Sequence, residues 1–151
     1  MSTRQSFQDD YEVIEQALRR LLWTEQKRFS RLLAQHELTL PQFLVLAAIR
    51  QRGAGCPIGT LADGMFQSYP TMTGIVDRLT VAGLVVRVSD PADGRKVVVN
   101  LTDAGRALLN RVRSARRERM IRALARFSLR DRRELLRLVK IYLETLEKED
   151  E

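Results

Sequence analysis

The stretch Gly83–Arg106, GLVVRVSDPADGRKVVVNLTDAGR, decides the fold of this chain. Two runs rich in valine and leucine, Leu84–Val88 and Lys96–Leu101, flank a connection made of Asp, Pro, Asp and Gly. β-Branched residues favour strands, and this turn chemistry reverses a chain. The stretch therefore predicts a two-stranded β-ribbon with Arg95 and Lys96 near its tip.

Helices are predicted after the ribbon. Thr102 offers a side-chain oxygen as an N-cap, and Asp103 places negative charge in the first turn, where the helix dipole favours it. The apolar positions of this helix are Leu108, Leu109, Val112, Met120, Ala123, Leu124 and Phe127. Ser128 caps a second helix, with Asp131 at the third position as a weak capping-box analogue. Its apolar stripe is Leu135, Leu138, Val139, Tyr142, Leu143 and Leu146.

Glycine and proline divide the chain into a turn-rich centre and two arms. All eight glycines and all four prolines lie within residues 41–105, and both residue types are absent from 1–40 and 106–151. The apolar stripe of the N-terminal arm is Phe7, Tyr11, Ile14, Leu18, Leu21, Leu22, Phe29, Leu32 and Leu33. Because neither amphipathic arm has an internal partner large enough to cover it, we expect an isologous homodimer.

The centre predicts three shorter helices before the ribbon. Thr39-Leu40-Pro41-Gln42 is a capping box that opens a helix through Arg50. The remaining elements are an extended Cys56-Pro57-Ile58, a short helix over Gly59–Met65 with Ile58, Leu61 and Ala62 facing inward, and a helix from Pro70 to Ala82 that ends at Gly83. The buried stripe of this third helix is Met72, Ile75, Val76 and Leu79.

Short helix, turn, helix and ribbon is the order of a winged helix-turn-helix, whose second helix enters the major groove of DNA. The predicted fold is mainly α with a small β-ribbon: a winged lobe at residues 38–104, flanked by dimerisation helices in 1–37 and 105–151. On the helix from Pro70, hydroxyl-bearing and basic side chains form the face that would meet DNA: Ser68, Tyr69, Thr71, Thr73 and Arg78. Arg95 and Lys96 lie beside it on the wing, where a cation can enter the minor groove.

Three segments resemble the multiple-antibiotic-resistance regulator (MarR) family over roughly residues 38–110: LTLPQFLVLAAI, PIGTLAD and the stretch that begins SYPTMTGIVDRL. The family wing usually reads Asp-Pro-x-Asp-Arg-Arg. This chain has Asp90-Pro91-Ala92-Asp93-Gly94-Arg95, so glycine replaces one of the paired arginines. The resemblance implies that Arg95 reaches into the minor groove and that Asp93 orients it. The family often carries arginine or another polar residue at the position of Gly74.

The resemblance also implies a homodimeric transcriptional regulator, usually a repressor, that binds palindromic double-stranded DNA operators. Members of the family often respond to small phenolic or other aromatic anions held between the dimer arms and the DNA-binding lobe. The sequence does not identify the effector-binding residues, the operator or the regulated genes.

Several residues keep two interpretations. Arg78 contacts a phosphate, or pairs with Asp90 or Asp77 to fix the wing. Tyr69 packs on the DNA backbone or covers the start of its helix, and Ser68, Thr71 and Thr73 meet phosphates or bases.

Three further side chains lie outside this face. Cys56 has no nearby His or Lys to lower its pKa, which favours a passive small residue over a redox sensor. Trp23 is expected in the dimer core, or beside Phe43 in an aromatic effector pocket. His36 is expected as a solvated or helix-end residue.

Composition narrows the function classes. The 151-residue chain has a formal charge of +7, and its cations are 22 arginines and 4 lysines. Arginine suits phosphate and base edges, although the same charge suits a basic helical interaction module that binds an acidic protein or RNA. With one cysteine, one histidine, no Gly-rich phosphate loop and no nucleophile–base pair, we expect no metal, no cofactor and no enzyme.

Location follows from the apolar segments. The longest apolar run, Phe43–Ile49, has seven residues, whereas a helix needs about 20 to span a bilayer. The N-terminal MSTRQSFQDD lacks the apolar core of a signal peptide. We therefore expect a cytoplasmic protein with no membrane partner.

Overall fold

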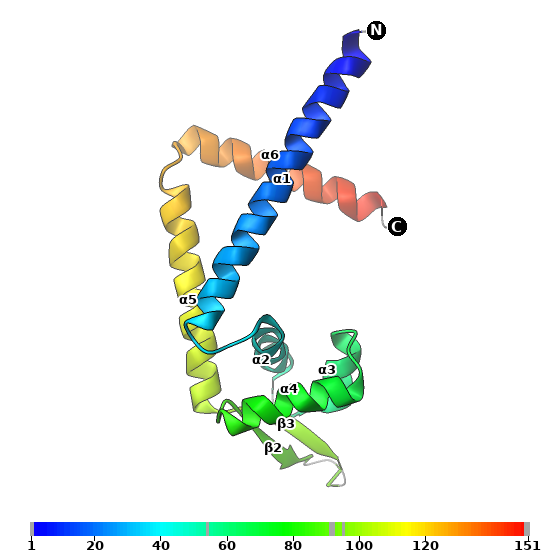
Figure 1. The fold of residues 1–151 in the computed structure, drawn as a ribbon, viewed down its shortest axis with the longest axis vertical. Helices are drawn as coiled ribbons and strands as arrows, with labels where there is room; N and C mark the ends of the chain where they lie inside the picture. Colours follow the sequence, from blue (N-terminus) through cyan, green and yellow to red (C-terminus); the bar gives the residue numbers. More distant parts are fainter. Residues whose placement is uncertain (1, 54, 91–92, 95, 150–151) are drawn as a thin grey trace. The chain divides into compact units, whose positions relative to one another are not determined.

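The computed structural model describes residues 2–53, 55–90, 93–94 and 96–149. Over these residues the chain forms six helices and one three-stranded antiparallel sheet, which confirms the mainly α fold with a small β-element (Figure 1). The chain divides into two compact units, Met1–Val112 and Arg113–Glu151.

The elements follow the predicted order. They are α1 (Ser2–Ala34), α2 (Leu40–Arg52), β1 (Cys56–Pro57), α3 (Ile58–Gly64), α4 (Tyr69–Val81), β2 (Val85–Ser89), β3 (Val97–Leu101), α5 (Asp103–Leu124) and α6 (Leu129–Glu149). Some boundary predictions were wrong: α5 ends at Leu124, so Phe127 lies outside it, and Ile58, predicted to be extended, begins α3, which ends at Gly64 before Met65. The N–H groups of residues 125–127 bond back to the last turn of α5, and Ser128 then caps α6 through Asp131 as predicted.

Local hydrogen bonds set the bounds of α2. The Gln42 N–H donates to the Thr39 side-chain oxygen, and the Thr39 N–H donates to the Gln42 side-chain oxygen at 2.8 Å. This is the predicted capping box. Gly53 ends the helix at a φ of 85°, which a residue with a Cβ rarely adopts.

The predicted two-stranded ribbon was incomplete, because β1 adds a third strand. The strand order is β1-β3-β2, with Cys56 opposite Val99 and Pro57 opposite Val98. The Gly55 N–H also donates to the Asn100 side-chain oxygen at 2.5 Å. β1 covers the edge of β3 that a two-stranded ribbon would leave unpaired.

The core of the first unit is built from α2, α3, α4, the sheet and the ends of α1 and α5 that adjoin them. Its largest fully buried side chains are Leu33, Val45, Leu46, Ile49, Leu61, Met72, Val76, Leu79, Val98, Val99, Leu109 and Val112. The inward-facing residues predicted for α3 and the buried stripe predicted for α4 are confirmed. This stripe fixes which face of α4 is turned to solvent.

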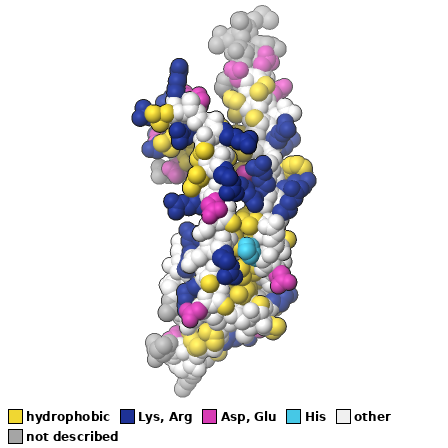
Figure 2. Space-filling model, turned by 90° about the vertical axis from the view of Figure 1, so that its left-hand side faces the viewer, with side chains coloured by type: hydrophobic (Ala, Val, Ile, Leu, Met, Phe, Trp, Pro, Cys, Tyr) yellow, Lys and Arg dark blue, Asp and Glu magenta, His cyan; other side chains and the backbone are white. Residues whose placement is uncertain are grey.

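Much of the arms is exposed. On α1, Tyr11, Ile14, Leu21 and Leu22 are exposed, whereas Leu32 and Leu33 are buried. On α6, every residue from 129 to 148 is exposed, including the whole predicted apolar stripe. Figure 2 shows such hydrophobic side chains at the surface among lysines and arginines. No helix in the described part of the chain is long and apolar enough to cross a bilayer.

Candidate nucleic-acid interface

The start of α4 is an exposed, hydrogen-bonding helix end. Ser68 is its N-cap: the Ser68 oxygen accepts from the Thr71 N–H at 3.3 Å and lies 2.8 Å from the Thr71 hydroxyl oxygen. Tyr69 follows with 58% of its surface exposed. The Thr71 N–H is bonded to Ser68 and Pro70 has no N–H, so this end offers mainly its side-chain hydroxyls to a phosphate.

Thr73 differs from the other hydroxyl-bearing residues of this face in the burial of its hydroxyl group. Its hydroxyl oxygen is buried and has no hydrogen-bond partner among the described residues. In this conformation Thr73 therefore does not present its hydroxyl to a ligand. Ser68, Tyr69, Thr71 and Arg78 are exposed on α4, as the sequence analysis expected of this face.

An ion pair that the sequence analysis missed joins α4 to the wing. The Arg87 guanidinium of β2 lies 2.7 Å from the Asp77 carboxylate of α4, and Arg87 is two-thirds buried. Sequence reasoning had offered Asp77 to Arg78, its neighbour in the chain. The signal for Arg87 was the strand alternation, since Val85 and Arg87 lie on the same face of β2.

The tip of the wing is closed by backbone bonds. The Asp90 N–H donates to the Lys96 carbonyl, and the Lys96 N–H donates to the Asp93 carbonyl, both at 2.8 Å. The Lys96 ammonium also lies 3.4 Å from the Asp93 carboxylate. Arg95, the cation predicted to enter the minor groove, lies outside the described residues.

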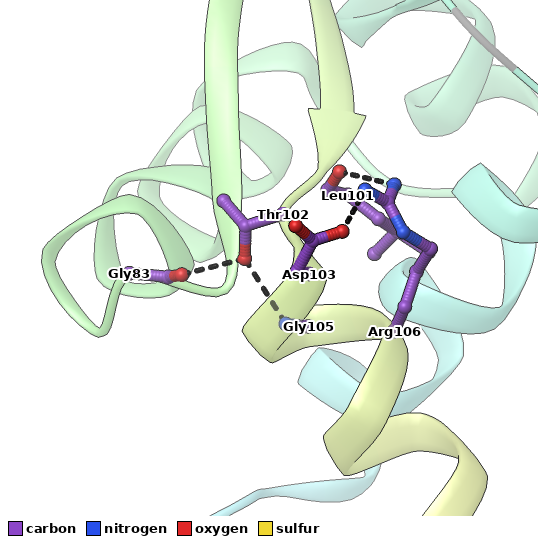
Figure 3. Close-up of polar contacts among 6 residues, drawn as sticks. All are labelled: Gly83, Leu101, Thr102, Asp103, Gly105 and Arg106. Carbon is purple, nitrogen blue, oxygen red and sulfur yellow. Dashed lines mark hydrogen bonds and ion pairs between the residues drawn. The ribbon is translucent and has the colours of Figure 1, made fainter.

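The base of the wing is fastened through Thr102 (Figure 3). Its hydroxyl donates to the Gly83 carbonyl at 2.7 Å and accepts from the Gly105 N–H at 3.0 Å. The Thr102 N–H donates to the Leu84 carbonyl at 3.1 Å. One side chain thus caps α5, as predicted, and also holds the bend between α4 and β2.

Arg106 fastens the same junction from α5. Its guanidinium donates to the Leu101 carbonyl at 2.7 Å and to the Asp103 carboxylate at 2.6 Å (Figure 3). The sequence analysis did not assign Arg106. The end of β3 and the first turn of α5 are therefore joined by hydrogen bonds from both Thr102 and Arg106.

Cys56 is buried within the sheet. Only 1% of its surface is exposed, and burial raises the pKa of its thiol. This environment supports the interpretation of Cys56 as a small packing residue. Among the described residues, no group of three or more His, Cys, Asp or Glu side chains is arranged to hold a metal ion.

The two aromatic candidates for an effector pocket make separate ring contacts. The Lys27 ammonium lies 4.0 Å from the centre of the Trp23 ring, and Trp23 is exposed. Phe43 packs edge-on against Phe29 with ring centres 5.1 Å apart. His36 is half-buried in the turn after α1.

Sequence comparisons relate the chain to transcriptional regulators. The family model described as MarR family matches residues 36–96. The uncharacterized HTH-type transcriptional regulator YsmB of Bacillus subtilis is 33% identical over 105 residues, which cover 70% of this chain and 71% of YsmB. The HTH-type transcriptional repressor NicR of Pseudomonas putida is 36% identical, over 66% of this chain and 65% of NicR. TtmR of Methylorubrum extorquens is 38% identical, but the match spans 54% of this chain and only 42% of TtmR.

Solved structures share the fold at low sequence identity. A mutant of Staphylococcus aureus MepR has a TM-score of 0.82 at 19% identity, covering 87% of this chain and 97% of MepR. YusO of Bacillus subtilis has a TM-score of 0.78 at 23% identity, covering 97% and 99%. A MepR–DNA complex has a TM-score of 0.74 at 21% identity, covering 87% and 98%.

Proposed function

The chain belongs to the MarR family, and on that premise we propose that it is a dimeric, sequence-specific DNA-binding transcriptional repressor. The observation that carries the proposal is the exposed, Ser68-capped start of α4, held beside the wing by the pair between Asp77 and Arg87. An exposed, hydroxyl-bearing helix start next to a cationic hairpin fits the major groove and the adjoining minor groove. The MepR–DNA complex has the same fold, which supports DNA as the partner.

The proposed DNA-binding surface lies within the winged lobe, residues 38–104. Its residues are Ser68, Tyr69, Thr71 and Arg78 from α4, and Arg95 and Lys96 from the wing. Asp93 and Asp90 shape the wing around these cations, and the Asp93 ion pair with Lys96 supports that role. The part given to Arg95 rests on its position in the Asp93-x-Arg95 motif. Thr73 joins this surface only if its hydroxyl rotates outward.

The proposed dimer is formed by the arms. Tyr11, Ile14, Leu21 and Leu22 of the α1 stripe and the whole stripe of α6 are exposed in the single chain, and a second copy would cover them. A twofold dimer would present two lobes to half-sites about 34 Å apart, one helical turn of DNA. We therefore propose a palindromic operator.

We also propose that a small aromatic or anionic effector relieves repression by this protein. Such a molecule acts only if it binds one spacing of the two lobes better than the other. An effector can then be identified in a binding experiment by the loss of operator affinity that it causes. The same experiment on variants would identify the residues that bind the effector.

The test is fluorescence anisotropy with labelled DNA from upstream of the chain's own gene, with random-sequence duplex as competitor. We expect tight, sequence-selective binding whose affinity falls steeply with salt, because phosphate contacts release counterions. Weak, sequence-blind retention would favour the alternative, a basic helical module that binds an acidic protein or RNA.

Variants locate the contact on the wing. Arg95→Ala should lower operator affinity and reduce the salt slope, since one cation is removed from the proposed DNA-binding surface. Arg52→Ala, which removes an exposed arginine from the end of α2, outside the proposed DNA-binding surface and the arms, is the matched control and should change neither. Unchanged affinity in Arg95→Ala would contradict the role given to the wing.

A further inference from the structure

The turn between α3 and α4 holds an aromatic residue in a conformation that favours glycine. Phe66 has a φ of 52°, in the left-handed region. The Gln67 N–H donates to the Ala62 carbonyl at 2.9 Å, and the Phe66 N–H donates to the Asp63 carbonyl at 3.2 Å. This is the Schellman pattern that ends a helix, with Phe66 at the position where glycine is most common.

No burial of the Phe66 side chain offsets this unfavourable backbone conformation. Its side chain is 97% exposed, so it contributes no buried apolar area to the lobe. A bulky residue with positive φ is a conformational outlier, and at 97% exposure the side chain that makes it unfavourable packs against nothing in the described part of the chain. Strain without compensation in the fold suggests that Phe66 contacts a molecule outside the chain.

The position of Phe66 indicates which molecule. It lies two residues before Ser68, the N-cap of α4, and residues 66–71 are all exposed. The start of a recognition helix is the part that meets base edges, so the turn before it reaches the rim of the major groove. There the apolar group that double-stranded DNA presents is the C5-methyl group of thymine.

We propose that Phe66 contacts a thymine methyl group in each half-site and thereby selects thymine at that position. The inference rests on the proposed DNA-binding function and adds an apolar reading element to its polar and cationic surface. Tyr69 is also exposed at this helix start and carries a hydroxyl group.

The experiment uses the full chain and a duplex selected by it from a random-sequence library. In Phe66→Gly, the thermal midpoint should rise by about 2 °C, because glycine adopts positive φ freely. Affinity for the selected duplex should fall roughly tenfold, the scale expected for partial burial of one aromatic side chain. Its salt dependence should not change, because Phe66 carries no charge. Val81→Ala is the control: Val81 is 91% exposed at the opposite end of α4, and its variant should bind like wild type.

Replacing each thymine of the duplex by deoxyuridine, one at a time, then removes single methyl groups. Wild type should lose affinity at one position per half-site, and Phe66→Gly should be indifferent there. If Phe66→Gly binds the selected duplex as tightly as wild type, or both proteins respond equally to every deoxyuridine, the inference is wrong while the proposed function stands. If Phe66→Gly instead weakens dimerisation without DNA, Phe66 is a contact between copies. If no preferred duplex is selected, the proposed function fails and the inference fails with it.

Discussion

Replacing Gly105 by alanine should destabilise the fold at the base of the wing. A Cβ at this position would lie 2.0 Å from the Leu84 carbonyl oxygen and 3.0 Å from the Leu84 carbonyl carbon. Both obstacles are backbone atoms, so no side-chain rotation relieves the clash. Either the first turn of α5 or the bend before β2 must therefore move.

The size of the effect follows from what that movement breaks. The Leu84 carbonyl accepts from the Thr102 N–H, and the Gly83 carbonyl accepts from the Thr102 hydroxyl. Each bond is worth about 1 kcal/mol net, and overpacking adds about 1–3 kcal/mol. Alanine regains only about 1 kcal/mol through its helix propensity. We expect Gly105→Ala to lower the free energy of unfolding by about 2–4 kcal/mol.

Urea unfolding followed by circular dichroism measures this change, and an unaltered m-value would assign it to native-state stability. Gly74→Ala in α4 is the matched control, because its added Cβ would have no heavy atom within 4 Å outside its own helix and chain neighbours. That variant should be more stable by up to about 1 kcal/mol. A Gly105→Ala protein within 1 kcal/mol of wild type would refute the reasoning about the wing base.

Three further predictions concern side chains of the lobe. A double-mutant cycle of Asp77→Ala and Arg87→Ala should give a coupling of about 0.5 kcal/mol in the free energy of unfolding. This coupling should weaken with salt, because the ion pair is partly solvated. Zero coupling at low salt would mean that the ion pair does not hold the wing. Thr73→Val should raise the free energy of unfolding by about 1 kcal/mol, because it removes an unpaired buried hydroxyl. The same variant should leave DNA affinity unchanged. A loss of affinity in an anisotropy titration would mean that the hydroxyl turns outward to DNA. Cys56 should react with Ellman's reagent only when the protein unfolds. Because burial raises the pKa of its thiol, its contribution to the free energy of unfolding should be constant below the pKa of the unfolded thiol, about 8.5, and should fall as the pH rises above that value. A Cys56→Ala protein whose urea stability declines equally at alkaline pH would contradict this prediction.

The sequence predicted those parts of the fold whose hydrogen bonds are local. The boxes at Thr39–Gln42 and Ser128–Asp131, and the cap at Thr102, join residues within four positions of each other. Residue types at fixed short spacing therefore carried enough information to locate the starts of α2, α5 and α6. The stripe of α4 was equally readable, because helical period alone separates its buried face from its exposed one.

The rest depended on contacts that spacing does not encode. β1 has two residues, shorter than any strand that alternation can reveal, and exists because β3 lies next to it. Asp77 and Arg87 are on different elements, so their pairing required the position of β2 against α4. Phe66 opposed the local rule altogether, because a search for helix ends looks for glycine or asparagine at positive φ.

The exposure of α6 couples the folding of this chain to its proposed association. A 21-residue helix whose residues 129–148 are all exposed gains little stability from packing within its own unit, and isolated helices of that length are marginal in water. Its regular apolar stripe needs a partner surface, and the proposed second copy supplies one. Thermal unfolding should then shift to higher temperature as protein concentration rises. A midpoint independent of concentration over a hundredfold range, with α6 fully helical, would argue against a dimer held together by this arm.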